Sequence, residues 1–136
     1  MKPILFLFAF GLSLASCNTG PKPGSGSKPA PAPAQEVFEY VCMGTEPFWS
    51  VEITAAGIYF STPEIAKTAY PYKAPKTTDA GAVYETEAMI GGVKSKLKVT
   101  VSPGACSDGM SDTEYPYFSE VVRDGETLKG CAREKD

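Results

Sequence analysis

Histidine is absent from the 136-residue sequence, and this absence narrows the chemistry that the protein can perform. The Ser-His-Asp triad, the Cys-His pair and every metal site built on imidazole need this residue. Lysine and arginine (13 residues) do not outnumber aspartate and glutamate (16), so the formal net charge is −3. Nucleic-acid-binding domains carry a basic excess. We therefore expect neither an enzyme nor a nucleic-acid-binding protein, and no metal or cofactor.

The sequence also has no apolar run long enough to cross a membrane as a helix. The run at residues 4–14 has about 11 residues, whereas a bilayer core of ~30 Å needs about 20. It follows Lys2 and ends in Leu14-Ala15-Ser16-Cys17. Small residues before a cysteine at this position resemble the lipobox of bacterial lipoprotein signal peptides. The resemblance implies cleavage before Cys17 and a diacylglycerol group on its sulfur; an ordinary secretory leader is the alternative.

Such a leader, residues 1–16, would be absent from the mature protein. Its removal takes away Lys2 and changes the formal charge from −3 to −4. Acyl chains on Cys17 would hold the protein at a membrane surface. Asn18 follows the cysteine in place of aspartate, which resembles the sorting pattern for the outer membrane. We therefore expect a lipid-anchored protein of the bacterial cell envelope, in the outer membrane and facing the periplasm.

Residues 18–35 consist almost entirely of proline, glycine, serine, lysine and alanine. The tract at 28–33 favours an extended polyproline II conformation, and the Gly-Ser stretch at 24–27 is flexible. Such a composition cannot bury enough apolar surface to fold. We therefore expect residues 17–35 to be a lipidated cysteine and a tether that separates a folded domain, residues 36–136, from the membrane.

Helical periodicity is scarce after residue 36, where short alternating runs are separated by glycine, proline and aspartate. Gly91-Gly92 predicts a two-residue hairpin over 82–101 that places Glu85 opposite Lys98 and Glu87 opposite Lys96. Asp124-Gly125 predicts a second hairpin with Glu120 opposite Lys129. Residues 62–76 are expected to be a long loop with a short extended piece. The pattern indicates an all-β protein, a small antiparallel barrel or sandwich of six to eight strands in meander order, and we expect a monomer.

Four cysteines leave three for the domain if Cys17 carries lipid, so one of Cys42, Cys106 and Cys131 stays unpaired. Disulfides persist in exported proteins. We favour Cys106–Cys131, which would tie the irregular segment 106–117 to the last strand. The alternative is Cys42–Cys131, which would join the first strand to the last and suits barrel closure equally well. The unpaired thiol is expected to be structural, because no histidine can activate it.

Two segments, 44–49 and 106–117, concentrate the distinctive side chains of the domain. Their candidate binding residues are Glu46, Trp49, Asp108, Asp112 and Tyr115. Each also has a structural interpretation, since aspartates commonly cap turns and tryptophan is commonly buried. Trp49 alternates with two apolar residues, which predicts that it points into the core. We expect the two aspartates to organise segment 106–117 against segment 44–49, with any binding site at their rim.

Two sequence patterns that could suggest chemistry do not fit their context. The stretch at 95–98 matches S-x-x-K, but Ser95 and Lys98 would point to opposite faces of a strand, so we expect no Ser-Lys catalyst. Asp108, Asp112 and Glu114 do not have the spacing of an EF-hand loop. These patterns predict neither a nucleophile nor a calcium site.

Three motifs together resemble a family of uncharacterised bacterial envelope lipoproteins, over roughly residues 41–132. They are G-x-E-P-F-W at 44–49, C-S-D-G-M-S-D-x-x-Y-P-Y at 106–117 and G-C-A at 130–132. The resemblance implies an envelope location and a β fold but no chemistry, and its motif cysteines match Cys106 and Cys131, which supports that pairing. Size and cysteine use also resemble the membrane-bound inhibitors of c-type lysozyme, which are small β-barrel lipoproteins, but no match to their inhibitory loop is present.

The expected function is that of a non-catalytic binding or structural module, with an envelope protein or a glycan as its ligand and the membrane as its anchor. One alternative is an inhibitor of c-type lysozyme. The other is a cell-wall hydrolase that would use the carboxylates of Glu46, Asp108 and Asp112 as acid and base.

Overall fold

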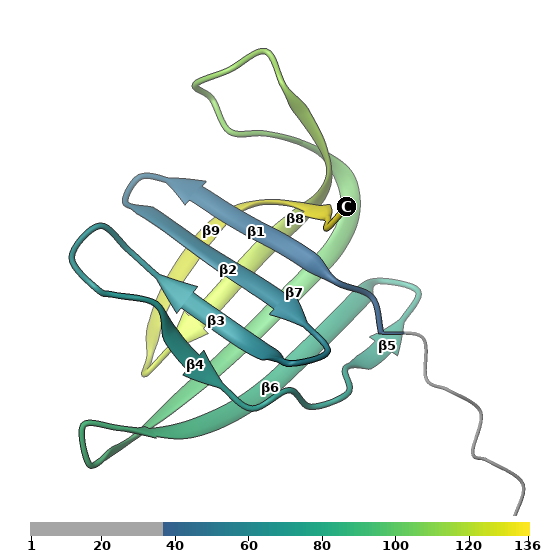
Figure 1. The fold of residues 1–136 in the computed structure, drawn as a ribbon. Helices are drawn as coiled ribbons and strands as arrows, with labels where there is room; N and C mark the ends of the chain where they lie inside the picture. The colour runs from purple at the N-terminus through teal and green to yellow at the C-terminus, as the bar shows by residue number, and fades with distance from the viewer. Residues whose placement is uncertain (1–36) are drawn as a thin grey trace, which may run out of the picture. The chain divides into compact units, whose positions relative to one another are not determined.

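A computed structural model describes residues 37–136 of the chain (Figure 1). The expected leader, the expected lipidation site Cys17 and the expected tether all lie outside these residues. The described part contains nine strands and no helix. The strands are β1 (Tyr40–Thr45), β2 (Phe48–Thr54), β3 (Gly57–Ser61), β4 (Thr68–Tyr70), β5 (Lys76–Thr78), β6 (Gly81–Ile90), β7 (Val93–Ser107), β8 (Glu114–Arg123) and β9 (Glu126–Glu134).

Every neighbouring pair of strands is antiparallel, in the order β4-β3-β2-β1-β9-β8-β7-β6-β5. The sheet thus consists of two meanders, β1–β4 and β5–β9, joined where the first strand pairs with the last. It curls into a half-barrel, and β1–β4 lie across from the strands of the second meander (Figure 1). The predicted all-β antiparallel class is confirmed. The count exceeds six to eight because two three-residue strands, β4 and β5, form within and at the end of the stretch expected to be a loop.

Both predicted hairpins have the predicted register. Glu85 lies opposite Lys98, Glu87 opposite Lys96, and Glu120 opposite Lys129. The turn dipeptides set these registers, because a slip of one residue would turn every buried side chain outward.

The ion pairs differ in part from those that the register suggests. Glu87 contacts Lys94 at 3.1 Å rather than the lysine opposite it, and Glu85 contacts Lys76 of β5 at 3.0 Å. Diagonal and next-strand neighbours lie within reach of a long lysine side chain, so the residue directly opposite is not always the partner.

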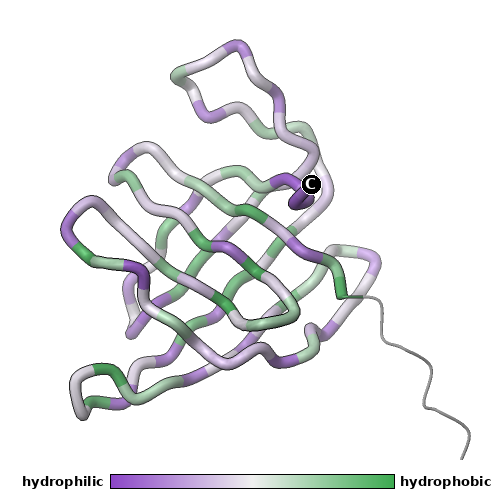
Figure 2. Tube along the Cα trace, in the orientation of Figure 1, coloured by the Kyte–Doolittle hydropathy of each residue, from purple (hydrophilic) through white to green (hydrophobic). Residues whose placement is uncertain are grey.

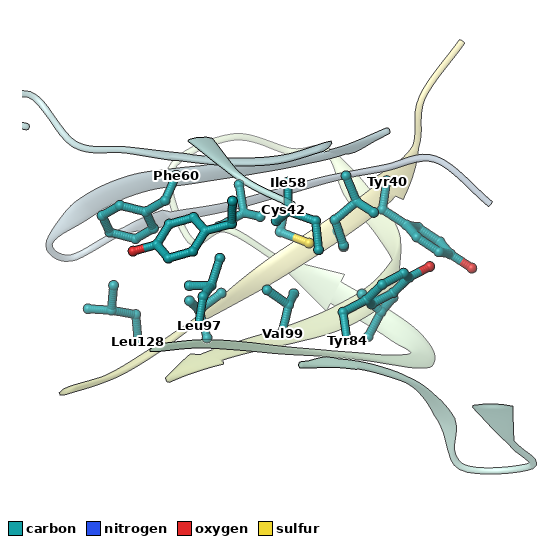
Figure 3. Packing of buried hydrophobic residues seen from close by; sticks show 14 of the residues in the cluster. Tyr40, Cys42, Ile58, Phe60, Tyr84, Leu97, Val99 and Leu128 are labelled. Atoms are coloured by element: carbon teal, nitrogen blue, oxygen red, sulfur yellow. The ribbon is translucent and has the colours of Figure 1, made fainter. Parts of the chain in front are cut away.

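Alternation along the strands produces the core. Hydrophobic and hydrophilic residues alternate along the long strands (Figure 2), and Trp49, Val51 and Ile53 all point inward as predicted. Figure 3 shows side chains of β1 and β3 packed against those of β6, β7 and β9. The largest fully buried side chains are those of Ile53, Ile58, Tyr70, Tyr84, Leu97, Val51, Val99, Val101 and Val121.

A disulfide joins Cys106 to Cys131, as predicted, with the two Cα atoms 5.6 Å apart. The alternative pair, Cys42–Cys131, cannot form in this register. Cys131 lies opposite Met43, whereas Cys42 lies opposite Ala132. Successive side chains of a strand point to opposite faces, so Cys42 enters the core while Cys131 faces away from it. Cys42 is a free, fully buried thiol. The bond closes a loop with a sequence separation of 25, which stabilises the fold by about 3 kcal/mol in the chain-entropy model.

Candidate functional site

The segments that carry the two long motifs meet at one end of the sheet. Thr45, at the end of β1, donates a hydrogen bond from Oγ1 to the backbone oxygen of Asp108 over 3.2 Å. This bond links the β1–β2 turn to the connection between β7 and β8, which projects beyond the sheet at the top of Figure 1. We call this part of the molecule the motif end, and it comprises residues 43–50, 61–65 and 106–115.

Trp49 forms the floor of the motif end, and only 4% of its surface is exposed. Its indole ring lies over Gly44, the residue opposite it on β1, and beside Gly130 of β9. A Cβ atom at Gly44 would overlap the indole Nε1, and one at Gly130 would overlap the carbonyl oxygen of Met43. The two glycines are therefore sterically required for the ring to lie flat against β1 and β9. This packing accounts for the tryptophan and the glycines of two of the motifs.

Asp108 organises the loop between β7 and β8. Its Oδ1 accepts hydrogen bonds from the backbone amides of Met110 (3.0 Å) and Ser111 (2.9 Å), and its Oδ2 accepts one from the Tyr115 hydroxyl (3.4 Å). The Ser111 hydroxyl also donates to this carboxylate. The amide of Ser111 is the main cause that holds the pKa of Asp108 below its ordinary value, followed by the amide of Met110. The expectation that Asp108 organises the segment is confirmed.

Asp112 does not share this role. Its side chain is exposed and accepts no hydrogen bond from any residue of 37–136. The expectation that both aspartates organise the loop is therefore wrong for Asp112, because Asp108 alone occupies the position from which the turn amides can be reached. The carboxylate of Asp112 is left on the surface.

Two cavities open at the motif end and share four lining residues, Met43, Gly44, Thr45 and Asp108. The first has a volume of about 390 Å³ and is further lined by Phe48, Trp49, Ser50, Ser61, Thr62 and Pro63. The second has a volume of about 290 Å³ and extends past Glu46 to the disulfide and Lys129. Two large apolar side chains stand exposed in the same region, Phe48 (54%) and Met110 (69%). Neither was among the candidate residues, because the exposure of an apolar side chain cannot be read from the sequence.

The candidate residues thus occupy three kinds of position. Trp49 is buried beneath the motif end. Asp108 and Tyr115 stabilise the loop between β7 and β8. Glu46 and Asp112 are exposed carboxylates at the surface. Within residues 37–136, no group of three or more His, Cys, Asp and Glu side chains is placed to hold a metal ion. A carboxylate that accepts several hydrogen bonds stays ionised, which suits Asp108 poorly to the role of a general acid.

A second polar cluster was not predicted from the sequence. Ser95 is buried at an inward-facing position of β7 and donates to Oδ2 of Asp124 over 2.7 Å. The hydroxyl of Tyr70 lies 2.7 Å from Ser95 Oγ and accepts from Arg123 Nε over 2.9 Å. Asp124 also accepts from the amide of Lys96. One feature of the sequence could have indicated this cluster. Ser95 is a polar residue at an inward-facing position of a strand whose next inward-facing residues are leucine and valines, so it needs a hydrogen-bond partner. Burial and these bonds agree with the rejection of Ser95 as a nucleophile.

Comparison with protein-family models, with curated proteins and with solved structures finds no match to this chain. Residues 37–136 include no helix of the length and apolarity that spanning a bilayer requires. The geometry of the motif end is therefore the feature of the protein that can indicate a function.

Proposed function

We propose that the protein is a lipid-anchored binding module of the cell envelope, that it is not an enzyme, and that the motif end is its binding surface. The observation that carries the proposal is the cavity of about 390 Å³ that residues of β1, β2 and 61–63 line together with Asp108, with Phe48 exposed at its side and Trp49 at its floor. Ligand sites are typically concave and mostly apolar with a few polar groups, and here Thr45, Asp108 and two serines supply the polar groups.

The bonds that hold this surface together also support a binding role. The Cys106–Cys131 disulfide, the Thr45–Asp108 hydrogen bond and the bonds of the Asp108 carboxylate hold three chain segments together. A surface ordered before binding loses less conformational entropy when a ligand arrives. The exposed Phe48 and Met110 would then contribute apolar contact area at little cost.

Photo-crosslinking in the producing cell tests the position of the binding surface. A benzophenone-bearing phenylalanine replaces Phe48 in the full chain, and the same group replaces Val93 at the tip of the β6–β7 hairpin as a matched control. Both positions are well exposed, at 54% and 70%. We expect a discrete crosslinked species from position 48 and none from position 93. The same product from both positions, or none from position 48, would count against the motif end.

Incubation with purified peptidoglycan separates the ligand classes. Co-sedimentation of the full chain that is lost with Phe48→Ser would identify a glycan ligand. Release of soluble fragments, abolished by Asp108→Asn, would overturn the non-catalytic assignment in favour of the carboxylate hydrolase. Inhibition of a c-type lysozyme by the chain would favour the inhibitor alternative.

The anchor is tested by Cys17→Ser. Without the sulfur there is no acceptor for diacylglycerol, so we expect the variant to leave the membrane fraction, because acyl chains supply the membrane affinity. Retention of the variant in that fraction to the same extent as the parent would contradict the lipid anchor.

A further inference from the structure

Positive charge is missing from the chain segments that build the motif end. No lysine or arginine occurs at residues 37–66 or at residues 99–122. The same segments carry five acidic residues at or next to the motif end, Glu46, Glu64, Asp108, Asp112 and Glu114. Five of the eight lysines of residues 37–136 lie elsewhere, on or beside β5, β6 and β7, and these are Lys73, Lys76, Lys94, Lys96 and Lys98.

Two basic residues next to the motif end, Lys129 and Lys67, already have carboxylate partners. Lys129 lines the smaller cavity, with its Nζ 3.7 Å from Oε2 of Glu120, and Lys67 contacts Glu52 at 2.8 Å. The carboxylates of Glu46, Asp112 and Glu114, by contrast, form no ion pair within residues 37–136. The negative charge of the motif end is therefore not neutralised by the described part of the chain.

The larger cavity lies beside two of these carboxylates: Asp108 lines it, and Glu46 lines the smaller cavity that shares four residues with it. Met43, Phe48, Trp49 and Pro63 contribute apolar side chains to the wall of the larger cavity, and Met110 stands exposed on the adjacent loop. Apolar anchors surrounded by charges of one sign are typical of protein interfaces, where the anchor supplies affinity and the charges supply steering and specificity.

From this combination we infer that the motif end binds a cationic polypeptide segment, which places one apolar side chain in the cavity beside Phe48 and its lysines or arginines against Glu46 and Asp112. The inference rests on the proposed function and adds the class of partner. An anionic lipid surface is disfavoured, because the carboxylates would repel its headgroups. An uncharged glycan would offer no positive charge to pair with the carboxylates.

Trp49 offers a direct measurement, since it is the sole tryptophan of the chain and lines the cavity. The full chain in non-ionic detergent is titrated with three synthetic peptides that lack tryptophan. The first carries arginine and glycine around a central phenylalanine, the second has glutamate in place of each arginine, and the third has alanine in place of the phenylalanine. We expect a saturable change in Trp49 emission with the first peptide, weaker binding of the third, and none of the second. Binding should weaken as salt rises from about 0.05 to about 0.3 M, because screening shortens the range of exposed charges.

Paired variants test the residues. Glu46→Gln/Asp112→Asn should weaken binding of the arginine peptide by roughly three- to tenfold. Asp79→Asn/Glu126→Gln removes the same net charge from exposed positions outside the motif end and should leave binding unchanged. Equal binding of the arginine and glutamate peptides, equal loss in both double variants, or indifference to salt would overturn the charge inference. In that case a crosslink from position 48 would still uphold the proposed function, whereas its absence would refute both.

Discussion

Thr45 and Asp108 are 63 residues apart in the chain, yet the hydroxyl of one donates to the backbone oxygen of the other over 3.2 Å. Thr45 ends the first strand, and Asp108 begins the loop that the disulfide restrains through Cys106. The contact places an exposed turn with Phe48 beside a loop whose shape depends on one carboxylate. The stability of the motif end should therefore respond to changes at its floor, in its loop and in the sheet beneath it.

Gly130→Ala should destabilise the protein by disturbing the packing of Trp49 beneath the motif end. The added Cβ would overlap the carbonyl oxygen of Met43 and lie 2.9 Å from the ring of Trp49, so the backbone of β1 or the indole must move. Overpacking of this kind costs about 1–3 kcal/mol. Urea unfolding measures the change. Gly92→Ala is the control, because its Cβ enters open space and its cost comes only from a positive φ of 83°. A Gly130 variant that is no less stable than the Gly92 variant would contradict the packing argument.

Ser95→Ala should destabilise the protein by disrupting the polar cluster of Tyr70, Ser95, Arg123 and Asp124. The change removes a donor to Asp124 and the acceptor of the O–H group of Tyr70, which is almost fully buried; the Tyr70 oxygen keeps its bond from Arg123. Leaving a buried polar group without its partner costs about 1–3 kcal/mol. Ser102→Ala on the same strand serves as the control, because Ser102 is half-buried and its hydroxyl forms no hydrogen bond within residues 37–136, and the expected change is within about 0.5 kcal/mol. Equal unfolding midpoints for the two variants would show that the cluster contributes nothing to stability.

The long hairpins could be predicted from the sequence because their information is local. Gly91-Gly92 and Asp124-Gly125 define the turns, and alternation of apolar residues defines the faces. Trp49 was placed inward by the same alternation. The disulfide joins segments that are distant in sequence, so local patterns left two pairings open, and Cys106–Cys131 was preferred because it ties segment 106–117 to the last strand.

The remaining features depend on contacts that no local pattern encodes. The pairing of β1 with β9 brings together the two ends of the domain, and β4 forms only because β3 offers it an edge. Asp108 accepts the hydrogen bonds of the loop and Asp112 does not, because only the carboxylate of Asp108 faces the amides of Met110 and Ser111. Two aspartates in one loop look alike in sequence, and only the backbone path distinguishes them.

Acidification should disorder the loop of the motif end through Asp108. The amides of Ser111 and Met110 lower the pKa of this carboxyl in the folded protein. Its stabilising contribution is therefore complete above the unfolded pKa of about 3.9, and it is lost as pH falls through the lower folded value. Titration of the amide NMR signals of Met110 and Ser111 should show this transition below about pH 4. In Asp108→Asn the transition should be absent. A transition at the same pH in that variant would assign it to another group.

Cys42 should be inert to thiol reagents as long as the protein is folded. Burial raises the pKa of its thiol to about 12, and its surface is fully covered. At pH 8 only about 10⁻⁴ of such a thiol is ionised, and the thiolate is the reactive form. We expect peptide mapping under non-reducing conditions to find Cys42 unlabelled in the native protein, fully labelled after unfolding in denaturant, and separate from a linked Cys106–Cys131 peptide. Thr127→Cys provides an exposed thiol on β9 as the positive control. Labelling of native Cys42 as fast as that control would mean that the core opens readily at β1, and a Cys42–Cys131 peptide would contradict the strand register itself.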